Sequence, residues 1–116
     1  MRILLLPTLL AASLAAGAAL AHHGWGSYDV DRKFTISAPV AVLAWGNPHV
    51  SLRVPHAGAT WDAVLAPPFR MEARGLTPEM IGSGAMVAVE GYPSNREATE
   101  MRAERITVDG RVFELR

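Results

Sequence analysis

The sequence predicts a mainly β protein: a small antiparallel barrel of five to six strands with a short helical insert, preceded by a signal peptide. Three observations carry this prediction. The first 21 residues look like an export signal, the rest of the chain alternates β-type segments with Gly- and Pro-containing turns, and a helical stretch falls midway along it. A sheet of this size in a short chain usually curls to remove its edges. An open sheet or a small sandwich is the alternative.

The N-terminal segment 1–21 has the pattern of a secretory signal peptide. Arg2 supplies the positive start, an uncharged Leu- and Ala-rich stretch follows, and Ala19-Leu20-Ala21 places small residues where signal peptidase requires them. An uncleaved membrane anchor is the alternative, but Pro7 and the cleavage triplet argue against it. We therefore expect one mature domain, 22–116, periplasmic or secreted, with no stable membrane insertion after cleavage.

The composition of the mature domain excludes several classes of function. The chain has 11 Lys and Arg and 11 Asp and Glu, so removal of Arg2 leaves 10 cations against 11 anions, a net charge of −1. Such a surface is poor for a phosphate backbone, which needs clustered cations, and we expect no nucleic-acid partner. The absence of cysteine excludes disulfides, thiolate metal sites and cysteine nucleophiles.

Three β-type segments precede the helical stretch, and each is bounded by turn residues. They are Phe34–Trp45, His49–Val54 and Trp61–Ala66. Pro39 cannot donate a ladder hydrogen bond, which predicts an edge or a bulge in the first segment. Residues 46–48 (Gly-Asn-Pro) read as a turn, and residues 55–60 read as a hairpin connection. The residues before Phe34 show no period, and we expect Trp25 and Tyr28 to dock that lead-in on the domain.

The second half of the mature chain reads as two helical turns followed by three strands. The helical turns fall at Phe69–Arg74 and Thr77–Ile81, and the strands at Ala85–Tyr92, Glu100–Val108 and Arg111–Leu115. Thr77 and Pro78 fit the N-cap and first position of a helix. Asp109-Gly110 predicts a two-residue type I′ turn. A helical segment between the third and fourth strands is typical of the oligonucleotide/oligosaccharide-binding (OB) fold, so we expect an OB-like barrel.

Several short elements together resemble a known family. They are His22-His23-Gly24-Trp25-Gly26-Ser27-Tyr28-Asp29, Trp45-Gly46-Asn47-Pro48-His49, Gly91-Tyr92-Pro93 and Asp109-Gly110-Arg111. Over essentially the whole mature chain, this pattern resembles a family of small exported proteins of Gram-negative bacteria that is catalogued as a domain of unknown function. The His pair and the Trp-x-Asn-Pro-His element are the specific part. The resemblance implies a small periplasmic β-barrel and supplies no activity. The family commonly has a Pro-Gly-Asp turn where this chain has Gly82-Ser83-Gly84.

The histidines are candidate ligands for copper. If cleavage follows Ala21, then His22 offers its free amine and its ring Nδ1 as a chelate, and one more imidazole completes a three-nitrogen set that suits copper(II). His49 is the natural third ligand because it follows a turn, and His23 is the other option. His56 falls in an expected surface loop and is the weakest candidate. Zinc is the next metal after copper.

Each of these residues also has a plain structural interpretation. Two histidines after a signal can form a solvated start, and His49 can hydrogen-bond to backbone in the core. The second functional hypothesis needs no metal: an aromatic patch at one end of the barrel binds an unidentified small molecule or a periplasmic protein. Its candidate residues are Trp25, Tyr28, Trp45, Asn47 and His49, although Trp45 and Asn47 also suit a structural turn.

The remaining charged and hydroxyl residues give little support for catalysis. Arg102, Glu100 and their neighbours read as a solvated charged face, and the serines lack a nucleophile-elbow context. The sequence therefore favours a binding domain over an enzyme. An oxidase with a copper site is the catalytic alternative. It needs an open coordination position on the metal, which a sequence does not reveal.

Overall fold

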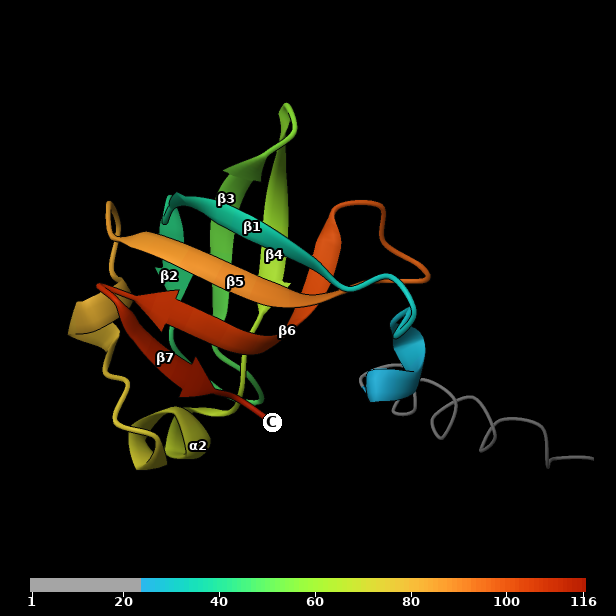
Figure 1. The fold of residues 1–116 in the computed structure, drawn as a ribbon. Helices are drawn as coiled ribbons and strands as arrows, with labels where there is room; N and C mark the ends of the chain where they lie inside the picture. The colour runs from blue at the N-terminus through green and yellow to red at the C-terminus, as the bar shows by residue number, and fades with distance from the viewer. Residues whose placement is uncertain (1–23) are drawn as a thin grey trace, which may run out of the picture.

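The structure is a computed structural model that describes residues 24–116, and most of its ordered elements are strands (Figure 1). The strands are β1 (Phe34–Pro39), β2 (Val42–Ala44), β3 (Ser51–His56), β4 (Ala59–Val64), β5 (Met86–Pro93), β6 (Glu100–Val108) and β7 (Arg111–Glu114). The short helices are η1 (Trp25–Ser27), α2 (Pro68–Ala73) and η2 (Pro78–Ile81). The expected signal peptide and its cleavage site lie outside the described residues and stay predictions.

All seven strands belong to one sheet with the order β1-β5-β6-β4-β3-β2, and β7 pairs with β6 beside that path. Figure 1 shows β1, β5, β6 and β7 crossing in front of β2, β3 and β4, so the sheet bends and its two parts face each other. The core fills the space between them with alternate residues such as Ile36, Leu52 and Val89, which are fully buried. The mainly β prediction is confirmed, and the path of strands is not closed.

The expected single strand from Phe34 to Trp45 is two strands, so the described chain has seven strands and not five or six. The chain changes partners between Val40 and Ala41: the Val40 amide donates to Ala85 beside β5, and the Ala41 amide donates to Arg53 on β3. Pro39 ends β1 at this corner, because its nitrogen carries no hydrogen for the ladder. The sequence located the irregularity correctly but not the change of partner.

The sheet is not purely antiparallel, which corrects a second expectation. β4 runs parallel to β6, with Asp62, Ala63 and Val64 opposite Glu100, Met101 and Arg102, while the other five pairings are antiparallel. The physical reason is the connection. α2, η2 and β5 lie between β4 and β6 in the chain, and such a long connection brings the chain back in the same direction.

The β3–β4 hairpin is longer than its sequence suggests. Residues 55–60 were expected to be loop, but Pro55 pairs with Thr60 and His56 with Ala59, so the turn holds only Ala57 and Gly58. Both turn residues have positive φ, 50° and 81°, as a type I′ turn requires. Asp109 and Gly110 also have positive φ, which confirms the turn expected there.

A bulge in β5–β6 gives the Gly91-Tyr92-Pro93 element a physical reason. Glu90 pairs with Arg105, but Gly91 pairs with Ala103, so one residue of β6 is skipped. A Cβ at Gly91 would overlap the backbone of Arg102 and Ala103. Only glycine therefore permits this close approach of β5 to β6.

The helical stretch closes one end of the core. Met71 from α2, Leu76 and Ile81 from η2 are all fully buried, which confirms two helical turns between the third and fourth expected strands. Thr77 occupies the N-cap of η2 as predicted, although its side chain makes no capping hydrogen bond. Among residues 24–116, no helix has the length and apolar character needed to span a bilayer.

Candidate functional site

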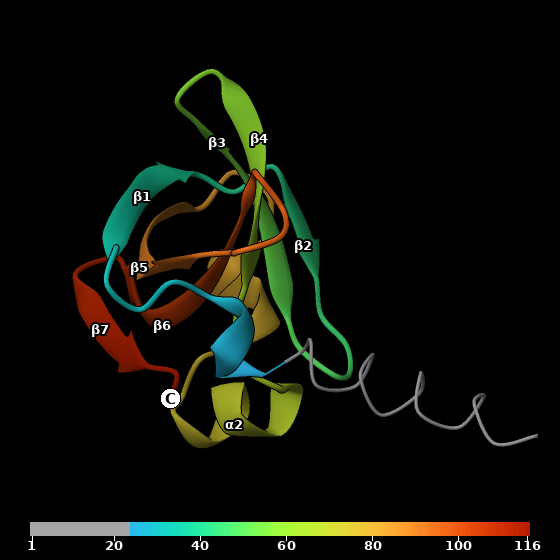
Figure 2. The ribbon, with the colours of Figure 1, turned by 90° about the vertical axis from the view of Figure 1, so that its right-hand side faces the viewer.

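The segment before β1 is fastened along the ends of β5 and β6. The Asp29 amide donates to the Pro93 carbonyl at 2.9 Å, and the Asn95 amide donates to the Ser27 carbonyl at 2.9 Å. Tyr28 forms a bridge with Ser94 and is buried. Figure 2 shows η1 in front of the strands and above α2. The expectation that Trp25 and Tyr28 dock the lead-in is confirmed.

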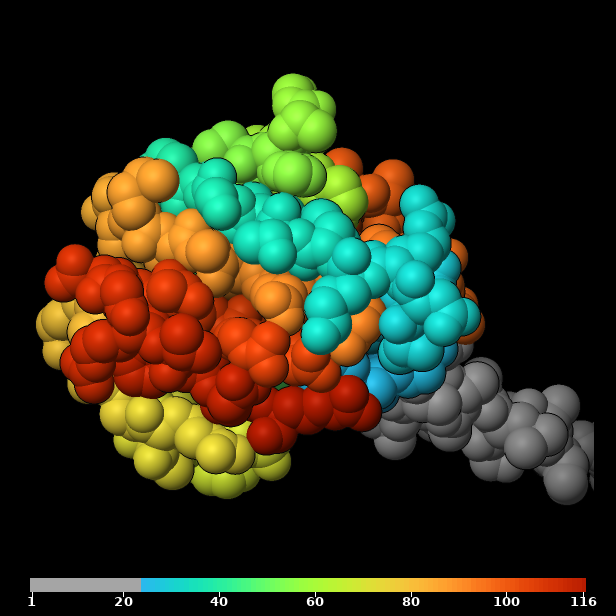
Figure 3. All heavy atoms as spheres, in the orientation of Figure 1, coloured from blue at the N-terminus to red at the C-terminus, as the bar shows by residue number. Residues whose placement is uncertain are grey.

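Trp25 contacts two guanidinium groups. The Arg102 Cζ lies 4.5 Å from its ring centroid and the Arg116 Cζ lies 4.3 Å from it. Figure 3 shows the C-terminal residues reaching the N-terminal segment on the surface. Cation–π contacts of this kind stabilise both partners, more so when the cation is shielded from water. The two ends of the described chain are thereby held together.

Arg102 is a buried cation, with 7% of its surface exposed. Its Nη2 donates to His49 Nε2 at 3.3 Å. Burial, with Arg70 and Arg116 nearby, lowers the pKa of Arg102, but a guanidinium keeps its proton in proteins. The structure thus places a permanent positive charge beside the histidine of the Trp-x-Asn-Pro-His element.

The turn before β3 positions His49. The Asn47–Pro48 peptide is cis, and His49 and Val50 follow it just before β3, where the Val50 amide donates to the Ala66 carbonyl and the Leu65 amide donates to the Val50 carbonyl. Because a guanidinium can only donate, His49 Nε2 accepts the hydrogen bond from Arg102, and in the neutral ring the proton is then on Nδ1.

Tyr28 holds the carboxylate of Glu100. Its hydroxyl donates to Glu100 Oε2 at 2.6 Å, a short hydrogen bond of the charge-assisted type. Burial, followed by this hydrogen bond, raises the pKa of Tyr28. Tyr28 therefore stays neutral and keeps donating, and Glu100 is fixed as an acceptor close to Arg102.

These groups surround a pocket of about 230 Å³, which we name the N-terminal pocket. Its lining residues are Tyr28, Pro48, His49, Ser51, Val64, Glu100 and Arg102. They come from the lead-in, the turn before β3 and the first residue of β3, the end of β4 and the start of β6, which are distant in sequence. The pocket combines a cation, a carboxylate, an imidazole and two hydroxyl groups.

The structure places the predicted site residues in three groups. Tyr28 and His49 line the N-terminal pocket, and Trp25 covers its arginine. Trp45 is half-buried against the core and Asn47 is exposed, and neither is among the lining residues. His22 and His23 lie outside the described residues, so their predicted role as ligands stays a prediction.

Sequence reasoning missed the two charged residues of this pocket. Arg102 and Glu100 were assigned to a solvated face, but Arg102 is buried under Trp25. The alternation of β6 puts Met101 and Ala103 on the core side and Arg102 on the other side, and nothing in that alternation indicates that the outer side is covered. The only available signal was the expected docking of Trp25.

His56 is also misplaced by the sequence. It belongs to β3 and not to a surface loop, and its ring packs against Phe34 and Trp61. In the part of the chain that the structure describes, no three His, Asp or Glu side chains gather as a metal site.

The family comparison places the chain in a family of unknown function. The model of a family of unknown function, DUF6152, matches residues 10–103, which is most of the chain. The chain therefore belongs to the DUF6152 family. No curated protein matches the sequence significantly.

Proposed function

We propose that this protein is an exported, non-enzymatic binding domain, and that its ligand site is the N-terminal pocket. The observation that carries the proposal is the buried guanidinium of Arg102, which lines a pocket together with His49 and Glu100. Burial removes water from this guanidinium, which is costly for a charge, and Arg70 and Arg116 add further positive charge near it, while Glu100 compensates part of that charge. An anionic group in the pocket would offset that cost.

The charges of the pocket indicate the class of ligand. An anion alone would meet the carboxylate of Glu100 as well as Arg102. A small zwitterion avoids this conflict, since its carboxylate can pair with Arg102 and its ammonium group with Glu100. A volume of about 230 Å³ is below the roughly 300–1,000 Å³ of sites for drug-sized ligands. We therefore infer a ligand the size of a small amino acid.

Two features support the expected OB-like barrel and export. β1 and β2 are the two ends of the sheet path, yet they follow one another in the chain through Val40 and Ala41, which is how one bent strand would join both halves of a barrel. The pattern of residues 1–21 supports export. We propose on these grounds an OB-like barrel released into the periplasm.

The test is a thermal-shift screen of the common L-amino acids, followed by calorimetry on the best. A ligand that binds only the folded state raises the melting temperature. We expect one or more small amino acids to bind, and the corresponding amide and hydroxy acid to bind at least ten-fold more weakly. The variants Arg102→Met and Glu100→Gln should each lower affinity at least ten-fold.

Arg111→Met is the matched control, because Arg111 is the first residue of β7 and does not line the pocket, so the change should leave affinity unchanged. Equal binding by wild type, Arg102→Met and Glu100→Gln would overturn the proposal, and so would an absence of binding by every amino acid in the screen.

Copper(II) is a second candidate ligand, held by His49 with His22 and His23. The supporting observation is that Trp25 contacts Arg102, which contacts His49. His23 is two residues from Trp25, and an extended chain spans about 3.3–3.6 Å per residue. The Arg102 guanidinium argues against copper, because His49 Nε2 would have to lose its hydrogen bond from Arg102 in order to bind the metal. Geometry therefore favours the first candidate.

Native mass spectrometry with stepwise copper(II) tests this second candidate. A mature chain that starts at His22 and holds one copper, lost in His49→Ala, would support it. Loose multiple adducts that are unchanged in His49→Ala would contradict it.

A further inference from the structure

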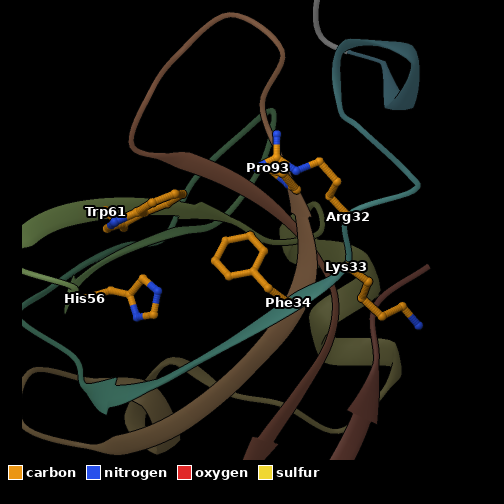
Figure 4. Close-up of a pocket in the computed structure, with 6 residues that line it drawn as sticks. All are labelled: Arg32, Lys33, Phe34, His56, Trp61 and Pro93. Carbon is orange, nitrogen blue, oxygen red and sulfur yellow. The ribbon is translucent and has the colours of Figure 1, made fainter.

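Three aromatic rings form a cluster away from the N-terminal pocket. Phe34 at the start of β1, His56 at the end of β3 and Trp61 in β4 have ring centroids 5.4–5.8 Å apart. Figure 4 shows the three rings turned toward one another from their separate strands. Such edge-to-face and tilted contacts hold rings in fixed orientations.

The alternation of each strand explains why these rings meet. Phe34 continues the core-facing row of Ile36, and His56 continues that of Val54. Trp61 likewise continues the row of Ala63. Each ring is thus the last core-facing residue at one end of the sheet, where the core meets solvent. All three are half-buried and not fully buried, so part of each ring is open to solvent.

A pocket of about 350 Å³ adjoins the rings, and we name it the aromatic pocket. Its lining residues are Arg32, Lys33, Phe34, His56, Trp61 and Pro93 (Figure 4). The volume lies at the lower end of the roughly 300–1,000 Å³ of small-molecule sites. It suits a ligand of one or two rings.

The two cations of the aromatic pocket differ in their partners. Lys33 lies 3.5 Å from Glu90 and 3.0 Å from Glu104, so its charge is compensated, and Figure 4 shows its side chain extending away from the rings. Among the described residues, the Arg32 side chain makes no ion pair. No carboxylate lines the pocket. The pocket therefore joins an aromatic wall to an uncompensated positive charge.

We propose that the aromatic pocket is a second binding site, and that it takes a planar aromatic carboxylate. The ligand ring packs on the open parts of Phe34, His56 and Trp61, and its carboxylate pairs with Arg32, for which a guanidinium provides two parallel donors. The site shares no lining residue with the N-terminal pocket. It therefore stands or falls independently of the proposed function.

The test is an NMR titration of ¹⁵N-labelled mature protein with 2-naphthoate. We expect the amide signals of residues 32–34, 56 and 61 to shift together along one saturable curve. Two comparison probes separate charge from shape. The uncharged 2-naphthamide and the non-planar decalin-2-carboxylate should each bind at least five-fold more weakly than 2-naphthoate.

Variants then assign the contacts. Arg32→Gln, an exposed change that leaves the core intact, should weaken 2-naphthoate at least five-fold and leave 2-naphthamide unchanged. Arg111→Gln is the matched control and should bind like wild type. Trp61→Leu should weaken both naphthalene probes, with circular dichroism confirming its fold.

Two results would overturn the proposal. One is the absence of saturable shifts at residues 32–34, 56 and 61. The other is equal affinity of wild type and Arg32→Gln for 2-naphthoate.

Discussion

The two pockets of this domain are built in opposite ways. The N-terminal pocket lies on the outer side of β3, β4 and β6, and the lead-in supplies the Trp25 ring that covers Arg102 and the Tyr28 hydroxyl that holds Glu100. The aromatic pocket lies at the open end of the core, and its rings are the last members of core-facing rows. One pocket depends on the docking of a short segment, and the other depends on the packing of the sheet itself. Substitutions should therefore affect the two pockets separately, except at the β5–β6 bulge, which sets the strand register that both pockets share.

The largest effect is expected at that shared register. Gly91→Ala should destabilise the whole domain by about 3 kcal/mol, near the upper end of typical overpacking costs, because the new Cβ meets backbone that cannot move aside. Chemical denaturation measures the loss. Gly26→Ala is the matched control, since its Cβ would meet no atom within 4 Å. Equal stability of Gly91→Ala and Gly26→Ala would contradict the bulge as the register-setting feature.

The aromatic pocket should respond next, because its rings are part of the core. Trp61→Ala should cost about 2–3 kcal/mol, less than the roughly 3–5 kcal/mol of a fully buried ring, since Trp61 is half-buried. Denaturant unfolding followed by circular dichroism measures this loss. A cost below about 0.5 kcal/mol would mean that the ring contributes as an ordinary surface residue does.

The N-terminal pocket should lose less stability when its cover is removed. Trp25→Ala should cost about 1–2 kcal/mol, the sum expected of two cation–π contacts. It should also raise hydrogen exchange at residues 25–29 and leave the exchange of Ile36 and Val89 unchanged. Val30→Ala, an exposed position on the same segment, serves as the control. Uniformly faster exchange across the sheet would show that the lead-in is not a separate unit.

The smallest effect concerns the outer face of the sheet between the pockets. The Lys33 ammonium beside the carboxylate, with the Tyr92 hydroxyl, lowers the pKa of Glu104. A lowered folded-state pKa stabilises above the unfolded value and is lost as pH falls through the folded value. Glu104→Gln should thus cost less than about 1 kcal/mol at pH 7, and the difference from wild type should vanish in strong acid.

Unfolding free energies of wild type and Glu104→Gln from pH 7 to pH 2 measure this dependence. Glu97→Gln in the exposed loop before β6 is the control. A difference between wild type and Glu104→Gln that grows toward low pH would have the wrong sign for this account.

The sequence predicted most strands because alternating hydrophobicity and turn residues are local properties of the chain. The end of β6 at Val108 was predicted, with the start of the strand left open, and the Asp109-Gly110 turn was predicted from its dipeptide. The parallel pairing of β4 with β6 was not predictable, because it depends on where the chain returns after the helical stretch. The hairpin between β3 and β4 was predicted, but its two-residue turn at Ala57 was not located, because alanine rarely adopts positive φ.

The candidate site shows the same division between residues that local motifs identify and residues whose role depends on distant segments. Tyr28 and His49 were singled out from motifs, and the structure brings them to one pocket. Arg102 and Glu100 were not, because their environment is created by the docked lead-in and not by their own neighbours in sequence. His56 was dismissed because its strand continues through Pro55, which usually ends strands.

The most direct test of two separate binding sites is an NMR titration of one sample. The sample receives first the amino acid selected by the thermal-shift screen and then 2-naphthoate. We expect the amino acid to shift the signals of Tyr28, His49 and Arg102 and to leave those of residues 32–34, 56 and 61 in place. We expect the reverse for 2-naphthoate. Amino-acid shifts confined to residues outside the N-terminal pocket, or no saturable shift at all, would contradict the assignment of that pocket as the ligand site.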